Sequence, residues 1–151
     1  MTAAGFDRLD KELWRLKNKE RHSIIQAISE AREHGDLSEN AEYHAAKERQ
    51  SLVEGRIQDL ESKLSRAQVI EASELSGDTV KFGATIKIVD EEDEEMIFQI
   101  VGVDEANIKK NLLSNSSPLA RGMMGKKVGD EVEVNTPRGG KSYELLEITF
   151  K

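Results

Sequence analysis

The stretch EHGDLSENAEYHAA, from Glu33 to Ala46, separates two segments of helix-favouring sequence. It contains a glycine and several acidic residues, whereas the segments on either side carry apolar residues at helical spacing. Glycine and short polar residues between two periodic segments are typical of a turn. The stretch therefore predicts a short connection between two long helices, which is an antiparallel helix hairpin.

The apolar residues on both sides of this turn recur every three or four positions, which places each set on one helix face. Before the turn, with a polar gap at Glu20, they are Phe6, Leu9, Leu13, Leu16, Ile24, Ile28 and Ala31. After the turn they are Val53, Ile57, Leu60, Leu64 and Ala67. We expect two helices of about 28 residues each, which gives a hairpin roughly 40 Å long with the turn at its far end.

The segment ELSGDT, from Glu74 to Thr79, marks a change from helical periodicity to alternation. We expect a hairpin domain over residues 1–75 and a second domain over residues 76–151. Alternation predicts two strands joined by an acidic turn at 90–95, and then a closing pair of strands. Their inward residues are predicted to be Val80, Phe82, Ala84, Ile86, Ile88, Met96, Phe98, Ile100, Val132, Val134, Leu146, Ile148 and Phe150. Ser117 and Pro118 predict the cap and first position of a short helix. The fold class is α+β, with a small antiparallel sheet.

Composition excludes several classes of function. The net charge is −7, and neither half of the chain is basic, so the whole chain does not match nucleic acid electrostatically. The absence of cysteine excludes disulfides, thiolate nucleophiles and cysteine-ligated zinc. The N-terminus has no apolar signal core, and no run of 18 apolar residues occurs. We expect a soluble cytoplasmic protein that does not contact membranes.

Asp36 and Glu39 in the turn allow two interpretations. Their spacing fits a capping box, in which Asp36 caps the second helix and Glu39 reaches back to its amide. Two carboxylates at the end of a long hairpin also form half of a Mg²⁺ site, which a second macromolecule would complete. His34 and His44 flank the turn, but they lack the ligand spacing of a transition-metal site.

Four segments closely resemble the bacterial Gre transcript cleavage (transcription elongation) factors. They are AREHGDLSENAEYHAAKERQ (31–50), EGRIQDLESKL (54–64), VGVDEAN (101–107) and SPLARGMMGKKVGDEV (117–132). The resemblance extends over nearly the whole chain in order. It implies an N-terminal antiparallel coiled coil followed by an FKBP-like C-terminal domain.

The resemblance also implies a mechanism in which the chain is not an enzyme by itself. The coiled coil of these factors enters the secondary channel of RNA polymerase, where Asp36 and Glu39 would act as catalytic tip carboxylates. They would bind a Mg²⁺ ion that the polymerase active centre supplies, and no cofactor is expected on the chain alone. The polymerase site would then cleave the extruded 3′ RNA of a backtracked complex, release short fragments and resume elongation.

Further site residues follow from the same resemblance. Supporting tip residues would be Asn40, Tyr43 and Lys47, and relatives often have arginine at the position of Lys47. Residues that dock the chain at the rim of the channel would be Asp104, Glu105, Ser117, Pro118 and Arg121. The expected partners are RNA polymerase and the extruded RNA, with DNA reached only through the elongation complex, and the chain is expected to be a monomer.

Alternatives remain at this stage. A polymerase inhibitor of similar architecture would occupy the channel without promoting hydrolysis, and a scaffold would use the acidic residues only as caps. The basic side chains of the first helix either contact RNA or form the solvated face of the coiled coil; they are Lys11, Arg15, Lys17, Lys19 and Arg21.

Overall fold

The computed structural model describes residues 1–33, 35, 40–137 and 139–150, and it contains two compact units. One unit is Phe6–Ala67, and the other combines Met1–Gly5 with Gln68–Lys151. These limits differ from the predicted domains, 1–75 and 76–151, in two ways: the first five residues belong with the C-terminal part of the chain, and the second boundary lies between Ala67 and Gln68. The α+β class is confirmed.

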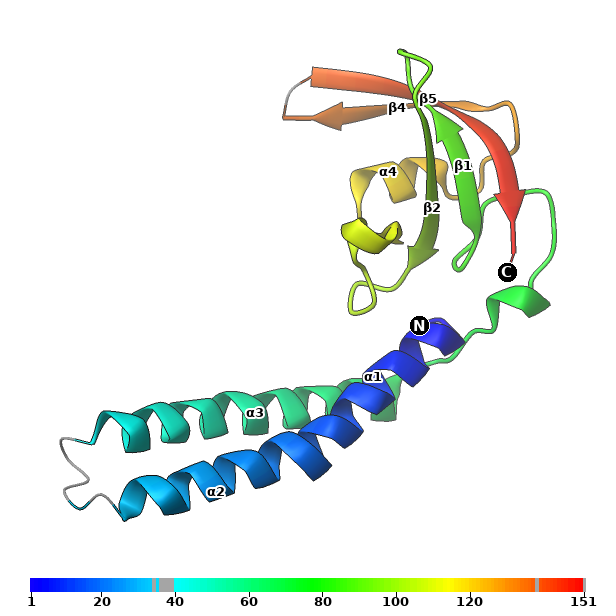
Figure 1. Cartoon of the computed structure of the whole chain (residues 1–151). Coiled ribbons are helices and arrows are strands. Elements are labelled where there is room, and N and C mark those ends of the chain that lie inside the picture. The colour runs from blue at the N-terminus through cyan, green and yellow to red at the C-terminus, as the bar shows by residue number, and fades with distance from the viewer. Residues whose placement is uncertain (34, 36–39, 138, 151) are drawn as a thin grey trace. The chain divides into compact units, whose positions relative to one another are not determined.

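The Phe6–Ala67 unit is a helix hairpin, as predicted. Helix α1 (Ala3–Arg15) continues through a π-helical turn, η1 (Leu16–Glu20), into α2 (Arg21–Arg32). After the connection, α3 (Ala41–Arg66) runs back beside α2 and η1 (Figure 1). The buried residues between the helices are Leu9, Leu16, Ile24, Ile28, Ala31, Ile57 and Leu60. They come from the predicted apolar stripes, which confirms the seam.

The π-helical turn is a feature that the apolar pattern contains but that we did not predict. Leu9 and Leu16 are seven positions apart, and so are Ile24 and Ala31, whereas Leu16 and Ile24 are eight apart. The turn holds one extra residue, because the backbone amide of Arg21 donates to the carbonyl of Leu16, five positions earlier. The extra residue keeps the apolar stripe facing α3 on both sides of the polar gap.

The other unit contains a five-stranded sheet in the order β3-β2-β1-β5-β4. Its strands are β1 (Thr85–Val89), β2 (Glu95–Val101), β3 (Leu112–Ser114), β4 (Glu131–Thr136) and β5 (Gly139–Thr149). Helix α4 (Pro118–Met123) packs against β4, and single 3₁₀ turns lie at η2 (Ala72–Glu74) and η3 (Ile108–Lys110). The core comprises Val80, Ala84, Ile86, Ile88, Ile100, Leu113, Ala120, Met123, Val132, Val134 and Leu145.

Three details of the sheet differ from prediction. The sheet is mixed rather than antiparallel, since the short strand β3 pairs parallel with β2. The first strand begins at Thr85 rather than Val80, because the amide of Ala84 donates to the carbonyl of Lys81 in a turn whose Gly83 has a φ of +88°. A register shift opposite Lys87 and Ile88 leaves one extra residue in β5.

That register shift decides which leucine enters the core. Lys87 lies opposite Glu147, while Ile88 lies opposite Leu145, so Leu146 is the extra residue. Leu145 is consequently fully buried, and Leu146 is only partly buried. Simple alternation predicts the reverse, because it assumes an unbroken strand. Ile148 and Phe150 pack against the core, as predicted.

Candidate functional site

The predicted tip carboxylates, Asp36 and Glu39, lie outside the described residues, as does His34. The site can therefore be described from the two helix ends that flank it. Helix α2 ends at Arg32, and the amide of its C-cap, Glu33, donates to the carbonyls of Glu30 and Ala31. Gly35 follows with a φ of +98°, a conformation in which a residue without a Cβ avoids strain.

Helix α3 begins at Ala41, and its N-cap is Asn40. The Asn40 side-chain oxygen accepts from the backbone amide of Tyr43 at 3.0 Å, and the capping role considered for Asp36 lies outside the described residues. The other end of the same amide group donates to the carbonyl oxygen of Ala31 at 2.6 Å. Asn40 thus links the first turn of α3 to the last turn of α2.

The other predicted supporting residues lie along α3. Tyr43 is half-buried, with its ring 6.0 Å from the guanidinium carbon of Arg32 and edge-on to His44. Lys47 is exposed, and its ammonium donates to the side chain of Gln50 at 3.3 Å. The structure therefore brings Asn40 and Tyr43 together at the helix ends and leaves Lys47 on the surface.

The polar gap of the first helix is an ion-paired layer. Arg21 donates to both carboxylate oxygens of Glu54, at 2.7 and 2.9 Å, in a bidentate pair between the helices. This hydrogen bonding raises the pKa of Arg21 above its usual value and lowers the pKa of Glu54. Glu20 accepts from Arg49 at 2.7 Å. Polar residues at this level therefore hold the helices together where the apolar seam is interrupted.

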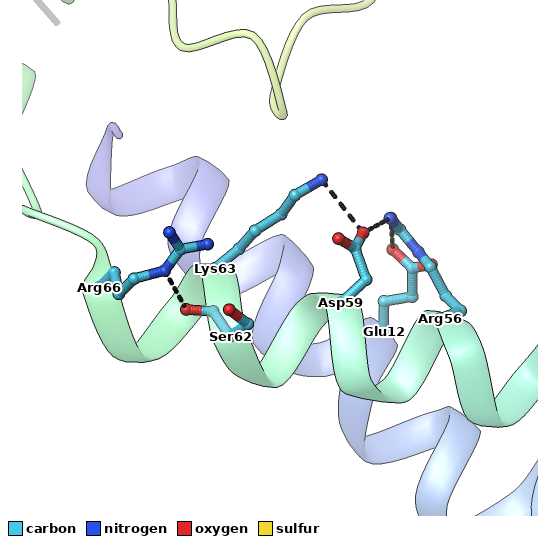
Figure 2. A network of polar contacts seen from close by, with 6 residues as sticks. All are labelled: Glu12, Arg56, Asp59, Ser62, Lys63 and Arg66. Atoms are coloured by element: carbon cyan, nitrogen blue, oxygen red, sulfur yellow. Dashed lines mark hydrogen bonds and ion pairs between the residues drawn. The ribbon is translucent and has the colours of Figure 1, made fainter.

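A second layer of ion pairs centres on Arg56 (Figure 2). Its guanidinium forms a bidentate pair with Glu12, at 3.0 and 3.1 Å, and a further contact with Asp59 at 3.1 Å. The hydrogen bonds to Glu12 raise the pKa of Arg56, and hydrogen bonding from Lys63 is the main reason that the pKa of Asp59 is lowered. Figure 2 also shows Arg66 donating to the carbonyl of Ser62.

The five basic residues considered for RNA contact engage neighbouring side chains. Lys11 pairs with Asp7 at 2.9 Å, and the Lys19 ammonium lies 5.8 Å from the ring centroid of Trp14. The remaining ion pairs are Arg15–Glu20, Lys17–Glu61 and Arg21–Glu54. These contacts favour the interpretation of this surface as the solvated face of a coiled coil.

One predicted docking residue has a different position from the one expected. Glu105 is buried, with an exposed fraction of 4%, and its carboxylate accepts from both the amide and the hydroxyl of Thr2. It also accepts from the amide of Gly102 at 2.8 Å. The carboxylate is used inside its unit, so the structure does not support a direct docking contact by Glu105. No feature of the local sequence signals this, because residue 2 is its partner.

The other docking residues lie at or near the surface. Asp104, Pro118 and Arg121 are exposed. The Ser117 hydroxyl accepts from the amide of Ala120 at 3.2 Å, which confirms it as the cap of α4 with Pro118 at the first position. Ser117 is thus engaged in helix capping.

Among the residues that the structure describes, no group of three or more His, Asp or Glu side chains is arranged to hold a metal ion. His44 packs against Tyr43 instead of joining such a group. Within the same described ranges, no helix is long and apolar enough to cross a membrane.

Two family models match the chain, one for each of its parts. The model described as transcription elongation factor, N-terminal, matches residues 1–69, and that described as transcription elongation factor, GreA/GreB, C-term, matches residues 75–150. The chain therefore belongs to the GreA/GreB family of transcription elongation factors.

Relatives named GreA agree with this assignment. The chain is 62% identical over 152 residues to the transcription elongation factor GreA of Beijerinckia indica subsp. indica, with 100% of this chain and 97% of the relative covered. It is 61% identical to GreA of Maricaulis maris, with 99% and 96% covered. Among solved structures, GreA factor homolog 1 (Gfh1) of Thermus thermophilus is 30% identical, with a TM-score of 0.44 and 99% and 97% covered. Within the family, the sequence is most similar to GreA.

Proposed function

We propose that this chain stimulates transcript cleavage in backtracked elongation complexes by inserting its hairpin into the secondary channel of RNA polymerase. The observation that carries the proposal is family membership over both parts of the chain, with GreA relatives about as long as the chain itself. The hairpin supplies the reach: the 26 residues of α3 correspond to roughly 39 Å of helix.

The proposed reacting groups of the chain are the carboxylates of Asp36 and Glu39. Mg²⁺ takes oxygen ligands and commonly uses only one or two protein carboxylates, so this pair suits a site that is shared with another protein. A Mg²⁺ ion in such a site supplies Lewis-acid activation of water and stabilisation of the leaving oxygen. The part played by the chain is to deliver two carboxylates on a rigid support, and hydrolysis belongs to the polymerase.

Docking at the channel rim is proposed for the exposed residues Asp104, Pro118 and Arg121, with Ser117 shaping the start of α4. The partners are RNA polymerase and the extruded 3′ end of the RNA. We propose a monomer as the acting form, since both tip carboxylates lie on one hairpin and a second copy is not needed to supply them.

The test is RNA shortening in a stalled, backtracked complex. Wild type is expected to shorten the RNA from its 3′ end, while Asp36→Ala/Glu39→Ala binds polymerase and leaves the RNA intact. Glu92→Ala/Glu94→Ala is the matched control, because it removes the same charge from the exposed turn between β1 and β2. Asp36→Asn isolates the charge of one tip residue at nearly constant shape.

Two outcomes would overturn the proposal. If wild type binds polymerase and slows elongation without shortening the RNA, the chain is a channel inhibitor. If the double variant at the tip cleaves as fast as wild type, the carboxylates have no part in the reaction.

A further inference from the structure

The two helix ends that flank the tip are joined by side chains. Asn40 donates to the carbonyl of Ala31 at 2.6 Å and accepts from the amide of Tyr43 at 3.0 Å. A single side chain thereby binds a carbonyl in the last turn of α2 and a backbone amide in the first turn of α3. Both of its polar ends are used within the hairpin.

A second contact crosses the same gap. The guanidinium of Arg32, the last residue of α2, lies over the ring of Tyr43 in the first turn of α3, 6.0 Å from its centroid. The edge contact with His44, at 5.6 Å and 70°, supports the ring from its own helix. We call Asn40, Arg32, Tyr43 and the Ala31 carbonyl the clasp.

The clasp fixes the ends of the chain segment that carries Asp36 and Glu39. Ordering a connecting segment costs conformational entropy for each residue that must be fixed, and that cost falls when its ends are already held together. A contact between the helix ends therefore restricts where the two carboxylates can be presented, without touching any substrate.

We propose that Asn40 and Tyr43 are positioning residues for the tip carboxylates. This inference rests on the proposed function, and it differs from a role in which these two side chains contact RNA or polymerase. The two roles require different atoms of these side chains. The clasp needs the amide nitrogen of Asn40 and the ring face of Tyr43, whereas a contact with the partner would use the Tyr43 hydroxyl.

The experiment measures transcript cleavage as a function of factor concentration. Asn40→Asp keeps an oxygen for the Tyr43 amide but removes the donor to Ala31, and Tyr43→Leu removes the aromatic face. Both are expected to lower the cleavage rate at saturating factor by roughly ten- to a hundredfold, the scale of a displacement of about 1 Å. The concentration for half-maximal effect should not change. Tyr43→Phe should cleave like wild type, as should the control Ser51→Ala on the exposed face of α3.

Amide hydrogen exchange of the free protein provides a readout that does not depend on polymerase. Asn40→Ala should speed exchange at the Tyr43 amide by about fivefold, the loss expected for one helix cap, and leave the middle of α3 unchanged. If wild type fails to cleave but this exchange effect is present, the proposed function fails and the clasp stands.

Two results would overturn the positioning role. One is wild-type cleavage by both Asn40→Asp and Tyr43→Leu at saturating concentration. The other is an equal loss in Tyr43→Phe and Tyr43→Leu, which would assign the effect to the hydroxyl and hence to a contact outside the hairpin.

Discussion

The two compact units of this protein bury their apolar residues in different arrangements. The hairpin has one narrow seam, flanked by ion pairs whose side chains remain partly exposed. In the other unit, residues from β1 to β5, from α4 and from the loop before β1 form one continuous cluster. A side chain in the seam is surrounded by two helices, whereas a side chain in the cluster is surrounded by several elements. The stability of each unit should therefore depend to a different extent on any one buried side chain.

The largest expected effect is the loss of a core side chain in the sheet unit. Ile100→Ala removes a fully buried side chain, and we expect the free energy of unfolding to fall by about 4 kcal/mol, because a core built from several elements can collapse little around the cavity. Leu60→Ala, equally buried in the hairpin, should cost about 2 kcal/mol, since two helices can approach each other. Hydrogen exchange at amides of each unit measures both values. Equal losses of stability in Ile100→Ala and Leu60→Ala would contradict the expected difference between the two units.

The next effect concerns the buried carboxylate of Glu105. Glu105→Gln replaces an acceptor oxygen by a donor where the amides of Thr2 and Gly102 already donate. We expect a loss of about 1–3 kcal/mol in the stability of the Met1–Gly5 and Gln68–Lys151 unit, the cost of buried groups left without a partner. Glu94→Gln, at an exposed position, is the control for denaturant unfolding. A neutral Glu105→Gln would show that the amide can be accommodated.

Replacing glycine by alanine should change the free energy of unfolding in opposite directions in the two units. A Cβ at Gly122 would lie 2.6 Å from Val132 Cγ1, so Gly122→Ala is expected to cost about 1–3 kcal/mol through overpacking between α4 and β4. A Cβ at Gly55 in α3 meets nothing within 4 Å, so Gly55→Ala should stabilise the hairpin by about 0.5–1 kcal/mol through helix propensity. Thermal unfolding of both variants checks the signs. The same sign for both would remove the distinction.

The smallest expected effect is on how the stability of the hairpin depends on pH in the acidic range. Arg21 lowers the pKa of Glu54 in the folded hairpin, so the ionised form stabilises the fold above the unfolded value of about 4.5. That contribution is lost as the pH falls through the lowered folded pKa. The stability difference between wild type and Glu54→Gln should therefore shrink between pH 5 and pH 3, and it should be small because both side chains are partly exposed. A difference that grows on acidification would contradict the assignment.

The helix hairpin, the strand-rich second part, the α4 cap and the family could all be predicted from the sequence. The family is indicated by the resemblance of the segments at 31–50 and 117–132, whereas the other three depend on local patterns: helical period in Phe6–Ala31, alternation in Met96–Ile100, and propensity at Ser117 and Pro118. Such patterns express what a segment can bury on one face, and a segment carries that information without its neighbours.

Contacts between distant segments could be assigned only from the folded structure. Leu145 rather than Leu146 enters the core because β5 must match β1 around a bulge, and Glu105 is buried because Thr2 lies beside it. Asn40 caps α3, and its amide also reaches the carbonyl of Ala31 across the hairpin. In each case the free energy depends on a partner that local periodicity does not specify, so only the folded chain selects the residue.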